Sequence, residues 1–397
     1  MTLSDSILFD RAGRALDTFR IEIPSWGFAN TGTRFGKFVQ AAAATTLEEK
    51  FADAAEVNRL TGATPTLALH VLWDLANGAS DCGRVGELEQ RSGIRAGSIN
   101  PNLFQDQQYK FGSLCNPSEE VRRQAVSHVL DSIEIAKRLG CRDISLWLAD
   151  GSNYPGSQSI RNRIVWLEEA LRECHTSLAP GQRLLIEYKP FEPAFYHTDI
   201  ADWGMASHLA RMAGPQARVL VDTGHHYSAQ NIEQIVAWLI HTGELGGFHF
   251  NDRRYADDDL TLGSIDPYQI FRIFHEIHAA GREAQELEIA YMIDQSHNLK
   301  GKIEAMVQTV VTAQELWLKA ALVDREQLAH HQHTCDIVAA EETLRGAFWR
   351  DVRPLVAAWR EARGLPGDPL AALRASGYVE RIARERGGRE AAVSNYA

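Results

Sequence analysis

The sequence predicts a (β/α)₈ barrel over residues 1–299, followed by a helical extension over residues 300–397. Two observations lead to this prediction. Eight short apolar segments alternate with segments of helical spacing over about 275 residues, which is the pattern of a parallel sheet closed into a barrel. In addition, acidic and histidine residues recur where the later strands end, and barrel sites are built at strand ends.

The expected strands are short runs in which apolar residues dominate. They are residues 19–26, 66–71, 94–99, 143–148, 183–188, 218–222, 246–251 and 288–294. The helices expected between them cover residues 46–60, 118–139, 160–178, 200–213, 231–240 and 267–278. Ser118 is an N-cap residue and Gly140 a C-terminal stop for the second of these helices. In the extension, apolar residues recur at helical period in 303–323, 340–363 and 370–385.

Composition narrows the class of protein. Hydrophobic residues make up 45% of the 397 positions and charged residues 23%, which is ordinary for a globular enzyme. A net charge of -11 argues against a nucleic-acid partner, which favours a basic surface. The five cysteines form no C-x-x-C pair, and we find neither a secretory leader nor a membrane-spanning apolar run. We therefore expect a cytoplasmic protein with no membrane partner.

The stretch from Gly246 to Leu260 is the most informative in the chain. Side chains alternate along a strand, so Phe248 and Phe250 share one face and His249 points to the other. Three consecutive aspartates, 257–259, follow in the next loop. A strand histidine followed by Asp-x-Asp fits a divalent-metal site, although a solvated acidic loop beside a core histidine has the same pattern.

Four successive strand ends supply acidic or basic groups to one barrel mouth. They are Glu187 and Lys189, then Asp222 and His225, then His249 with Asp257 and Asp259, then Asp294; an earlier strand ends at His70. Each alone has a structural explanation, such as an ion pair or a turn former. Together they place five carboxylates in one pocket, where mutual repulsion is costly. Two divalent ions and Lys189 would neutralise them, and the oxygen-rich ligands favour Mn²⁺, Mg²⁺ or Co²⁺, with Zn²⁺ a further candidate.

Several motifs resemble one known enzyme family. They are Pro24-Ser-Trp-Gly27, Gly32-Thr-Arg-Phe35, Leu69-His-x-x-Trp-Asp74, Asp150-Gly-Ser-Asn153, Glu192-Pro-Ala-Phe-Tyr196, Val221-Asp-x-Gly-His-His226, Gly246-Gly-Phe-His-Phe-Asn-Asp252, Asp257-Asp-Asp-Leu260 and Met292-Ile-Asp-Gln-Ser-His-Asn298. With them the chain resembles, nearly end to end, the broad-specificity L-rhamnose isomerases among the xylose isomerase-like barrels. The resemblance implies metal-dependent aldose–ketose isomerisation, of L-rhamnose to L-rhamnulose and of other aldoses.

The resemblance also implies roles for individual residues. A structural ion would be held by Glu187, Asp222, His249 and Asp294, and a catalytic ion by Glu187, His225, Asp257 and Asp259. Catalysis would involve His70 at the sugar ring oxygen, Lys189 at O1, and Asp294. The substrate would also contact Trp73, Trp147, Ser296 and Phe35. Mn²⁺ is the implied metal, and both a hydride shift and an enediol route stay open.

The family arrangement implies a homotetramer in which Phe35 covers the pocket of a neighbouring subunit. Three alternative functions compete with the isomerase. A ketose 3-epimerase of related barrel type typically needs one ion and two glutamates, which the Asp-x-Asp loop does not favour. A barrel nuclease acting on abasic DNA would need a basic stripe. An inactive sugar-binding protein would not need all seven candidate ligands.

Overall fold

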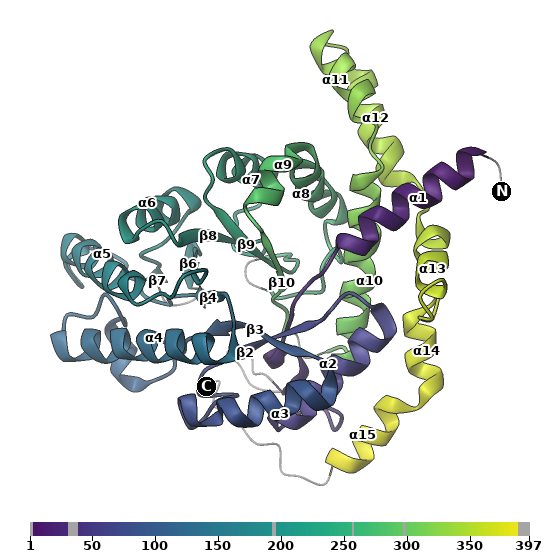
Figure 1. The fold of residues 1–397 in the computed structure, drawn as a ribbon. Coiled ribbons are helices and arrows are strands. Elements are labelled where there is room, and N and C mark those ends of the chain that lie inside the picture. Colours follow the sequence, from purple (N-terminus) through teal and green to yellow (C-terminus); the bar gives the residue numbers. More distant parts are fainter. Residues whose placement is uncertain (1–2, 31–38, 193–195, 256–257, 297–298, 388–397) are drawn as a thin grey trace.

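The computed structural model describes residues 3–30, 39–192, 196–255, 258–296 and 299–387. Its main sheet has eight parallel strands in the order β1-β2-β3-β4-β5-β8-β9-β10 (Figure 1). Their bounds are β1 Ile23–Pro24, β2 Thr66–His70, β3 Arg95–Asn100, β4 Asp143–Leu146, β5 Arg183–Glu187, β8 Ala217–Asp222, β9 Leu245–Phe250 and β10 Ala290–Ile293. Between the first and last strands, Glu22 N donates to Tyr291 O and Ile293 N to Glu22 O, at 2.8 and 2.9 Å. The predicted (β/α)₈ barrel is confirmed.

Helices surround the sheet and bury its outer face. They are α2 Leu47–Thr61, α3 Cys82–Ser92, α4 Glu119–Leu139, α5 Ile160–Thr176, α6 Trp203–Ala213, α7 Ile232–His241, α8 Pro267–Ala280 and the short α9 Arg282–Glu286. The caps expected for α4 are present: Ser118 accepts from Val121 N, and Gly140 is left-handed with φ 70°. Helix α3 was not predicted from the sequence, because only Val85 and Leu88 of its residues are buried. A small antiparallel hairpin, β6 Phe191–Glu192 with β7 Tyr196–His197, follows β5.

Helix α10 (Lys302–Ala321) follows the last strand and packs against α8 and α2, so it completes the ring of helices. The next pair, α11 (Arg325–His333) and α12 (Ile337–Trp349), projects away from the barrel, and α13 (Arg353–Glu361), α14 (Pro369–Ser376) and α15 (Tyr378–Arg386) run along its side (Figure 1). The stretches 340–363 and 370–385 are each broken into two helices. Pro354 lies in the first turn of α13 instead of continuing α12, and Gly377 takes φ 62° between α14 and α15.

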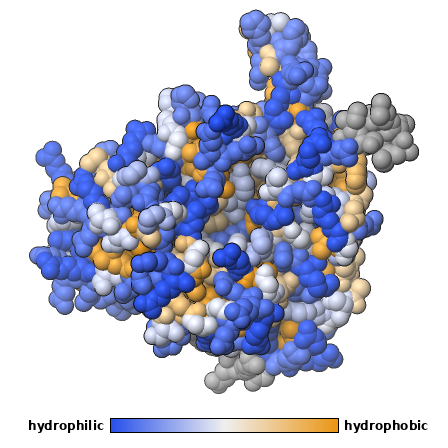
Figure 2. All heavy atoms as spheres, viewed as in Figure 1, coloured by the Kyte–Doolittle hydropathy of each residue, from blue (hydrophilic) through white to orange (hydrophobic). Residues whose placement is uncertain are grey.

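The first helix, α1 (Leu3–Thr18), packs against this C-terminal part of the chain. Its Ala12 and Leu16 join a separate buried cluster with Val356 and Trp359. On the face that Figure 2 shows, most residues on the surface of the barrel helices and of the projecting pair α11 and α12 are hydrophilic. No helix within the described residues is long and apolar enough to cross a membrane.

Candidate metal centre and sugar pocket

Two layers of side chains fill the barrel interior under its mouth. Leu185, Leu220 and Met292 form a buried apolar cluster inside the barrel. Two residues further along the same strands, and therefore on the same face, stand Glu187, Asp222 and Asp294. The period of the strands thus places three carboxylates directly over an apolar floor. On β9 the floor position is Gly247, where a Cβ would lie 3.0 Å from Ala290 O, and the residue above it is His249.

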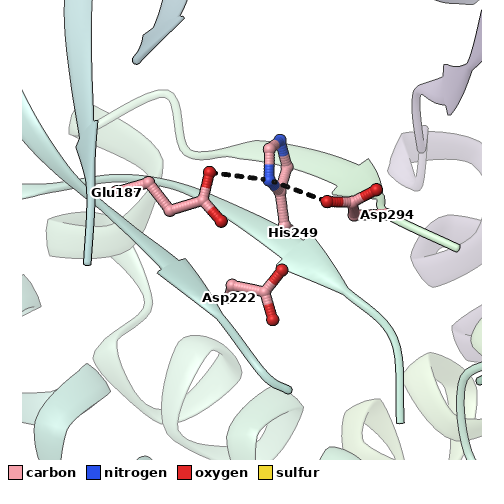
Figure 3. Close-up of side chains that lie close together, drawn as sticks. All are labelled: Glu187, Asp222, His249 and Asp294. Atoms are coloured by element: carbon pink, nitrogen blue, oxygen red, sulfur yellow. Dashed lines mark ion pairs between the residues drawn. The ribbon is translucent and has the colours of Figure 1, made fainter. Parts of the chain in front are cut away.

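These four side chains converge (Figure 3). Each of Glu187, Asp222, His249 and Asp294 offers one ligand atom, and these atoms all lie within 4.8 Å of one another. His249 Nδ1 is 3.2 Å from Glu187 Oε2 and 3.7 Å from Asp294 Oδ2. Phe248 and Phe250 are fully buried on the other face of β9 and stack at 4.7 Å. The inward direction expected for His249 is therefore correct.

The pKa values of these residues show that the cluster carries more negative charge than its own side chains neutralise. Burial raises the pKa of Asp222 to about 7, and Glu187 and Asp294 add to the rise against the opposing effect of His225. Burial alone would raise the pKa of Glu187, but His249 and His225 outweigh it and lower that pKa to about 2. Burial alone would lower the pKa of His249, but Glu187 and Asp294 raise it to about 9. The carboxylates thus stabilise His249 in its protonated, positively charged form, which neutralises them as a bound cation would.

A divalent cation fits this donor set. Three carboxylates and one imidazole are the ligands that Mn²⁺, Mg²⁺ and Co²⁺ accept. The hydrogen-bonding geometry points the same way, because among the described residues His249 Nδ1 has no hydrogen-bond partner despite lying beside two carboxylates. Such an arrangement suits atoms that face a common ion.

Neighbouring groups orient the carboxylates. Trp26 Nε1 donates to Asp294 Oδ1 at 2.8 Å, and Asn251 Nδ2 donates to both Asp222 oxygens at 3.1 Å. Gly224 N adds a third bond to Asp222 at 2.6 Å. Sequence reasoning did not assign Trp26 or Asn251 to the site. The signal for Asn251 was present, because it follows His249 by two residues and so faces the same side of the chain.

The second predicted ligand set is described only in part. His225 Nδ1 lies 3.2 Å from Glu187 Oε1 and 3.2 Å from the Tyr188 carbonyl oxygen, so His225 and Glu187 are close together. The Asp259 carboxylate accepts from the Ser296 hydroxyl at 3.0 Å, so these two predicted residues are in contact. Asp258 instead accepts from the backbone N–H groups of Arg254 and Tyr255 and shapes the loop. Asp257 lies outside the described residues.

An aromatic wall stands on the opposite strands. His70, at the end of β2, stacks on Trp73 with ring centroids 3.6 Å apart. Phe104, which sequence reasoning missed, meets His70 at 5.8 Å and Trp147 at 4.6 Å, both edge to face. Lys189 Nζ lies 5.2 Å from the centre of the Trp147 ring and 2.7 Å from Glu192 Oε2. The predicted wall residues Trp73 and Trp147 thus belong to one continuous surface, while Phe35 lies outside the described residues.

A cavity of about 80 Å³ brings further predicted residues together. Its lining includes Lys189, Phe191, His225, His226, Tyr227 and Tyr255. Lys189 from the β5 end and His225 from the β8 end therefore face one space, as their positions in sequence suggested. Tyr188, which precedes Lys189 in the chain, is fully buried, and its hydroxyl lies 2.6 Å from His226 Nε2.

The family assignment rests on sequence comparison. The family model described as "Xylose isomerase-like TIM barrel" matches residues 69–307, more than half of the chain. The chain belongs to this family. The match includes every described ligand of the metal cluster and also His70. The xylose isomerase-like barrel therefore explains why the site lies at the carboxyl ends of the strands.

Two relatives of similar length carry a functional name. A protein of Mesorhizobium japonicum named probable sugar isomerase is 40% identical over 390 residues, covering 95% of this chain and 90% of its own. A Rhizobium meliloti protein of the same name is 40% identical over 374 residues, covering 93% and 86%.

Solved structures support the fold at lower identity. A xylose isomerase domain protein from Alicyclobacillus acidocaldarius has a TM-score of 0.53 at 17% identity, covering 77% of this chain and 99% of its own. The apo 3-keto-D-glucoside 4-epimerase of E. coli has a TM-score of 0.52 at 14% identity, covering 76% and 99%. At these identities the likeness concerns the xylose isomerase-like fold alone.

Proposed function

We propose that this protein is a metal-dependent sugar isomerase that interconverts an aldose and a ketose. The observation that supports this most directly is the layer formed by Glu187, Asp222, His249 and Asp294, whose ligand atoms converge within 4.8 Å at the carboxyl ends of the strands. Membership of the xylose isomerase-like family and two relatives named probable sugar isomerase point to the same reaction class. The substrate would be a small polyhydroxylated molecule, which fits a pocket of histidine, tryptophan and lysine.

The finer proposal is L-rhamnose as the aldose and L-rhamnulose as the ketose, with activity on other aldoses. Two Mn²⁺ ions per chain would occupy the site. Glu187, Asp222, His249 and Asp294 would hold one, and Glu187, His225, Asp257 and Asp259 the other. When bound, such ions polarise a sugar carbonyl and lower the pKa of bound water.

His70 would act on the sugar ring through its Nε2 atom. His70 Nδ1 lies 3.0 Å from the carbonyl of Val71, and a carbonyl can only accept, so this network assigns the proton to Nδ1. Burial lowers the pKa of His70 to about 4, and the ring is neutral at physiological pH. Nε2 then carries a lone pair that can accept a hydrogen bond from the former ring oxygen once it is a hydroxyl of the open-chain sugar. Lys189 can donate to O1, and Trp73 and Trp147 would keep water from the reacting carbons.

A sugar panel tests this function. Protein stripped with a chelator should form ketose from aldose only after Mn²⁺ is restored, with L-rhamnose among the converted sugars. The matched control is Asp222→Asn, which keeps the size of the side chain but loses a ligand charge. Metal binding without any aldose–ketose conversion would contradict the proposal. Inversion of the configuration at C3 of a ketose, without conversion between aldose and ketose, would support a 3-epimerase.

Metal analysis tests the two-ion arrangement separately. Reconstituted protein should hold close to two equivalents per chain, and Asp257→Ala should keep one of them while losing activity. Retention of both ions and full activity in that variant would remove the Asp257 loop from the site.

Assembly is the last part of the proposal. We propose a homotetramer in which Phe35 covers the pocket of another subunit, so that water is excluded from the sugar. Phe35→Ala should then weaken sugar affinity or turnover with unchanged metal content. A fully active monomer in light scattering would contradict this arrangement.

A further inference from the structure

The turn that follows β2 contains a strained residue at the edge of the pocket. Leu72 has φ 80°, in the left-handed region, where a side chain that is not glycine costs conformational energy. Its side chain does not repay this through burial, because Leu72 is 42% exposed. Leu72 lies between His70 and Trp73, the two rings that stack in the aromatic wall. Strain of this kind persists only where surrounding contacts impose it.

Asp74 supplies those contacts. Its carboxylate Oδ2 accepts from the backbone N–H of His70 at 2.8 Å, while its own backbone N–H donates to the His70 carbonyl at 2.9 Å. These reciprocal bonds close the turn from both sides. The turn therefore cannot relax at Leu72 without breaking a buried hydrogen bond to His70.

The position of Asp74 is fixed in turn by groups from two other elements. Lys50, on α2, donates to Asp74 Oδ1 at 2.6 Å, and Ser25, in the 3₁₀ turn η1 (Ser25–Phe28), donates to Oδ2 at 2.5 Å. The Lys50 and Asp74 side chains are only 8% and 0% exposed. A buried ion pair costs much desolvation energy and is weak grounds for expecting stability. This one instead fixes the carboxylate that holds the turn.

The held turn determines how both rings face the pocket. With the backbone fixed, the Val71 carbonyl stays 3.0 Å from His70 Nδ1 and keeps the proton there. Trp73 is fixed at its far end, where Nε1 donates to Gln105 Oε1 at 2.7 Å. Both the tautomer of His70 and the stacking of Trp73 thus depend on the backbone between them.

We propose that Asp74, supported by Lys50 and Ser25, is a positioning residue that imposes the strained turn at Leu72 and so presents His70 and Trp73 to the substrate. This inference rests on the proposed sugar-isomerase function, which supplies the role of His70. It assigns no contact between Asp74 and the substrate.

The test separates positioning from simple loss of stability. Removing one partner leaves a buried charge alone, so both are replaced by apolar residues of similar size in Lys50→Met/Asp74→Leu. We expect kcat/KM to fall on the order of tenfold to a hundredfold, the scale of small misplacements of catalytic groups, with metal content unchanged. The conservative Lys50→Met/Asp74→Asn keeps an acceptor for the His70 N–H and should retain most of kcat/KM.

Adding a change at Leu72 tests the strain itself. In the Lys50→Met/Asp74→Leu background, Leu72→Gly makes the left-handed turn accessible without support and should recover several-fold of the lost kcat/KM. Leu72→Ala removes the same side chain but keeps the Cβ, and it should recover nothing. Equal effects of Gly and Ala, or unchanged kinetics in the double variant, would overturn the proposal.

The melting temperature keeps this test independent of the proposed function. If wild-type protein converted no sugar, the isomerase proposal would fail and the kinetic comparison could not be made. Leu72→Gly should still melt at a higher temperature than Leu72→Ala in the same background. Equal melting temperatures would then exclude a turn held under strain.

Discussion

Two buried acidic clusters in this protein have similar geometry and different chemistry. The first is the metal cluster of Glu187, Asp222, His249 and Asp294. The second, which we call the scaffold cluster, is Cys115, Asp150 and Asp199, which lie in the loops that precede α4, follow β4 and follow β7. In each, the ligand-type atoms lie within 4.8 Å of one another. Proximity of potential ligands therefore does not by itself distinguish a metal site.

The scaffold cluster already contains its cation. The Arg163 side chain is fully buried, and its Nη2 lies 2.6 Å from Asp199 Oδ2. Asp150 accepts from the backbone N–H groups of Ser113 and Cys115. Burial, with Asp150 and Asp199 nearby, raises the pKa of the Cys115 thiol well above its usual value, and a protonated thiol is a poor metal ligand.

The metal cluster has no comparable guanidinium among the described residues, where the ion partners of its carboxylates are the histidines His225 and His249. The absence of a guanidinium beside its carboxylates in the described part of the chain, and not the distance between ligand atoms, therefore makes the cluster of Glu187, Asp222, His249 and Asp294 the better candidate for a metal site. The scaffold cluster joins loops around a buried guanidinium, while the cluster of Glu187, Asp222, His249 and Asp294 has donor atoms that could hold a metal ion.

The largest expected effect is on catalysis. Glu187→Gln should lower kcat/KM on the order of a thousandfold, because bound metal supplies several kcal/mol of transition-state stabilisation. The same change of charge at the scaffold cluster, Asp150→Asn, should leave metal content unchanged. Elemental analysis and sugar turnover measure both. Loss of metal from Asp150→Asn would remove the distinction between the clusters.

The second effect is on stability, and here the larger loss is expected at the scaffold cluster. Arg163→Met leaves the buried carboxylates of the scaffold cluster without a partner, which should cost about 3–5 kcal/mol of unfolding free energy. In the metal-free protein Glu187→Gln removes the attraction of Glu187 to His249 and His225 but also its repulsion of Asp222 and Asp294, so these losses and gains partly cancel and it should cost less than Arg163→Met. Urea unfolding of both variants in chelator makes the comparison. A smaller loss for Arg163→Met than for Glu187→Gln would mean that the roles are reversed.

A third, smaller effect concerns support of the metal ligands. Asn251→Ala removes both hydrogen bonds to Asp222 and should weaken metal affinity about 10- to 100-fold, as other changes beside metal ligands do. Asn116 is the matched control, since its Nδ2 donates to the Gly112 carbonyl beside the scaffold cluster. Asn116→Ala should alter the melting temperature and not the affinity for Mn²⁺. Calorimetric titration of the stripped proteins with Mn²⁺ decides between these outcomes.

The barrel and the convergence of Glu187, Asp222, His249 and Asp294 could be predicted from the sequence because both follow from strand period, while the metal ion itself stays a prediction. Glu187, Asp222 and Asp294 stand two residues beyond inward-facing Leu185, Leu220 and Met292, and that spacing can be counted. The scaffold cluster could not be predicted, because Arg163 comes from the middle of the chain and reaches Asp199 only after the loops fold. The breaks at Pro354 and Gly377 were visible as residue types, but apolar periodicity continued across them.

The smallest expected effect is the number of protons released when metal binds. It tests whether unneutralised charge distinguishes the two clusters. His249 can bind a metal ion only as neutral imidazole, yet its pKa is raised to about 9 by Glu187 and Asp294 against the lowering effect of burial. At pH 8 the ring is therefore mostly protonated, while Asp222, with a pKa of about 7, is mostly ionised.

Binding of Mn²⁺ to this cluster at pH 8 should thus release about one proton. Because only the neutral form of His249 binds the ion and its pKa is about 9, affinity should increase about fivefold from pH 8 to pH 9 and level off above that pH. A pH indicator in weakly buffered solution measures the release, and Glu187→Gln, which loses a ligand, is the control. The scaffold cluster should contribute nothing, since Arg163 already balances it. Binding without proton release would mean that His249 is neutral beforehand, and that charge demand does not distinguish the two clusters.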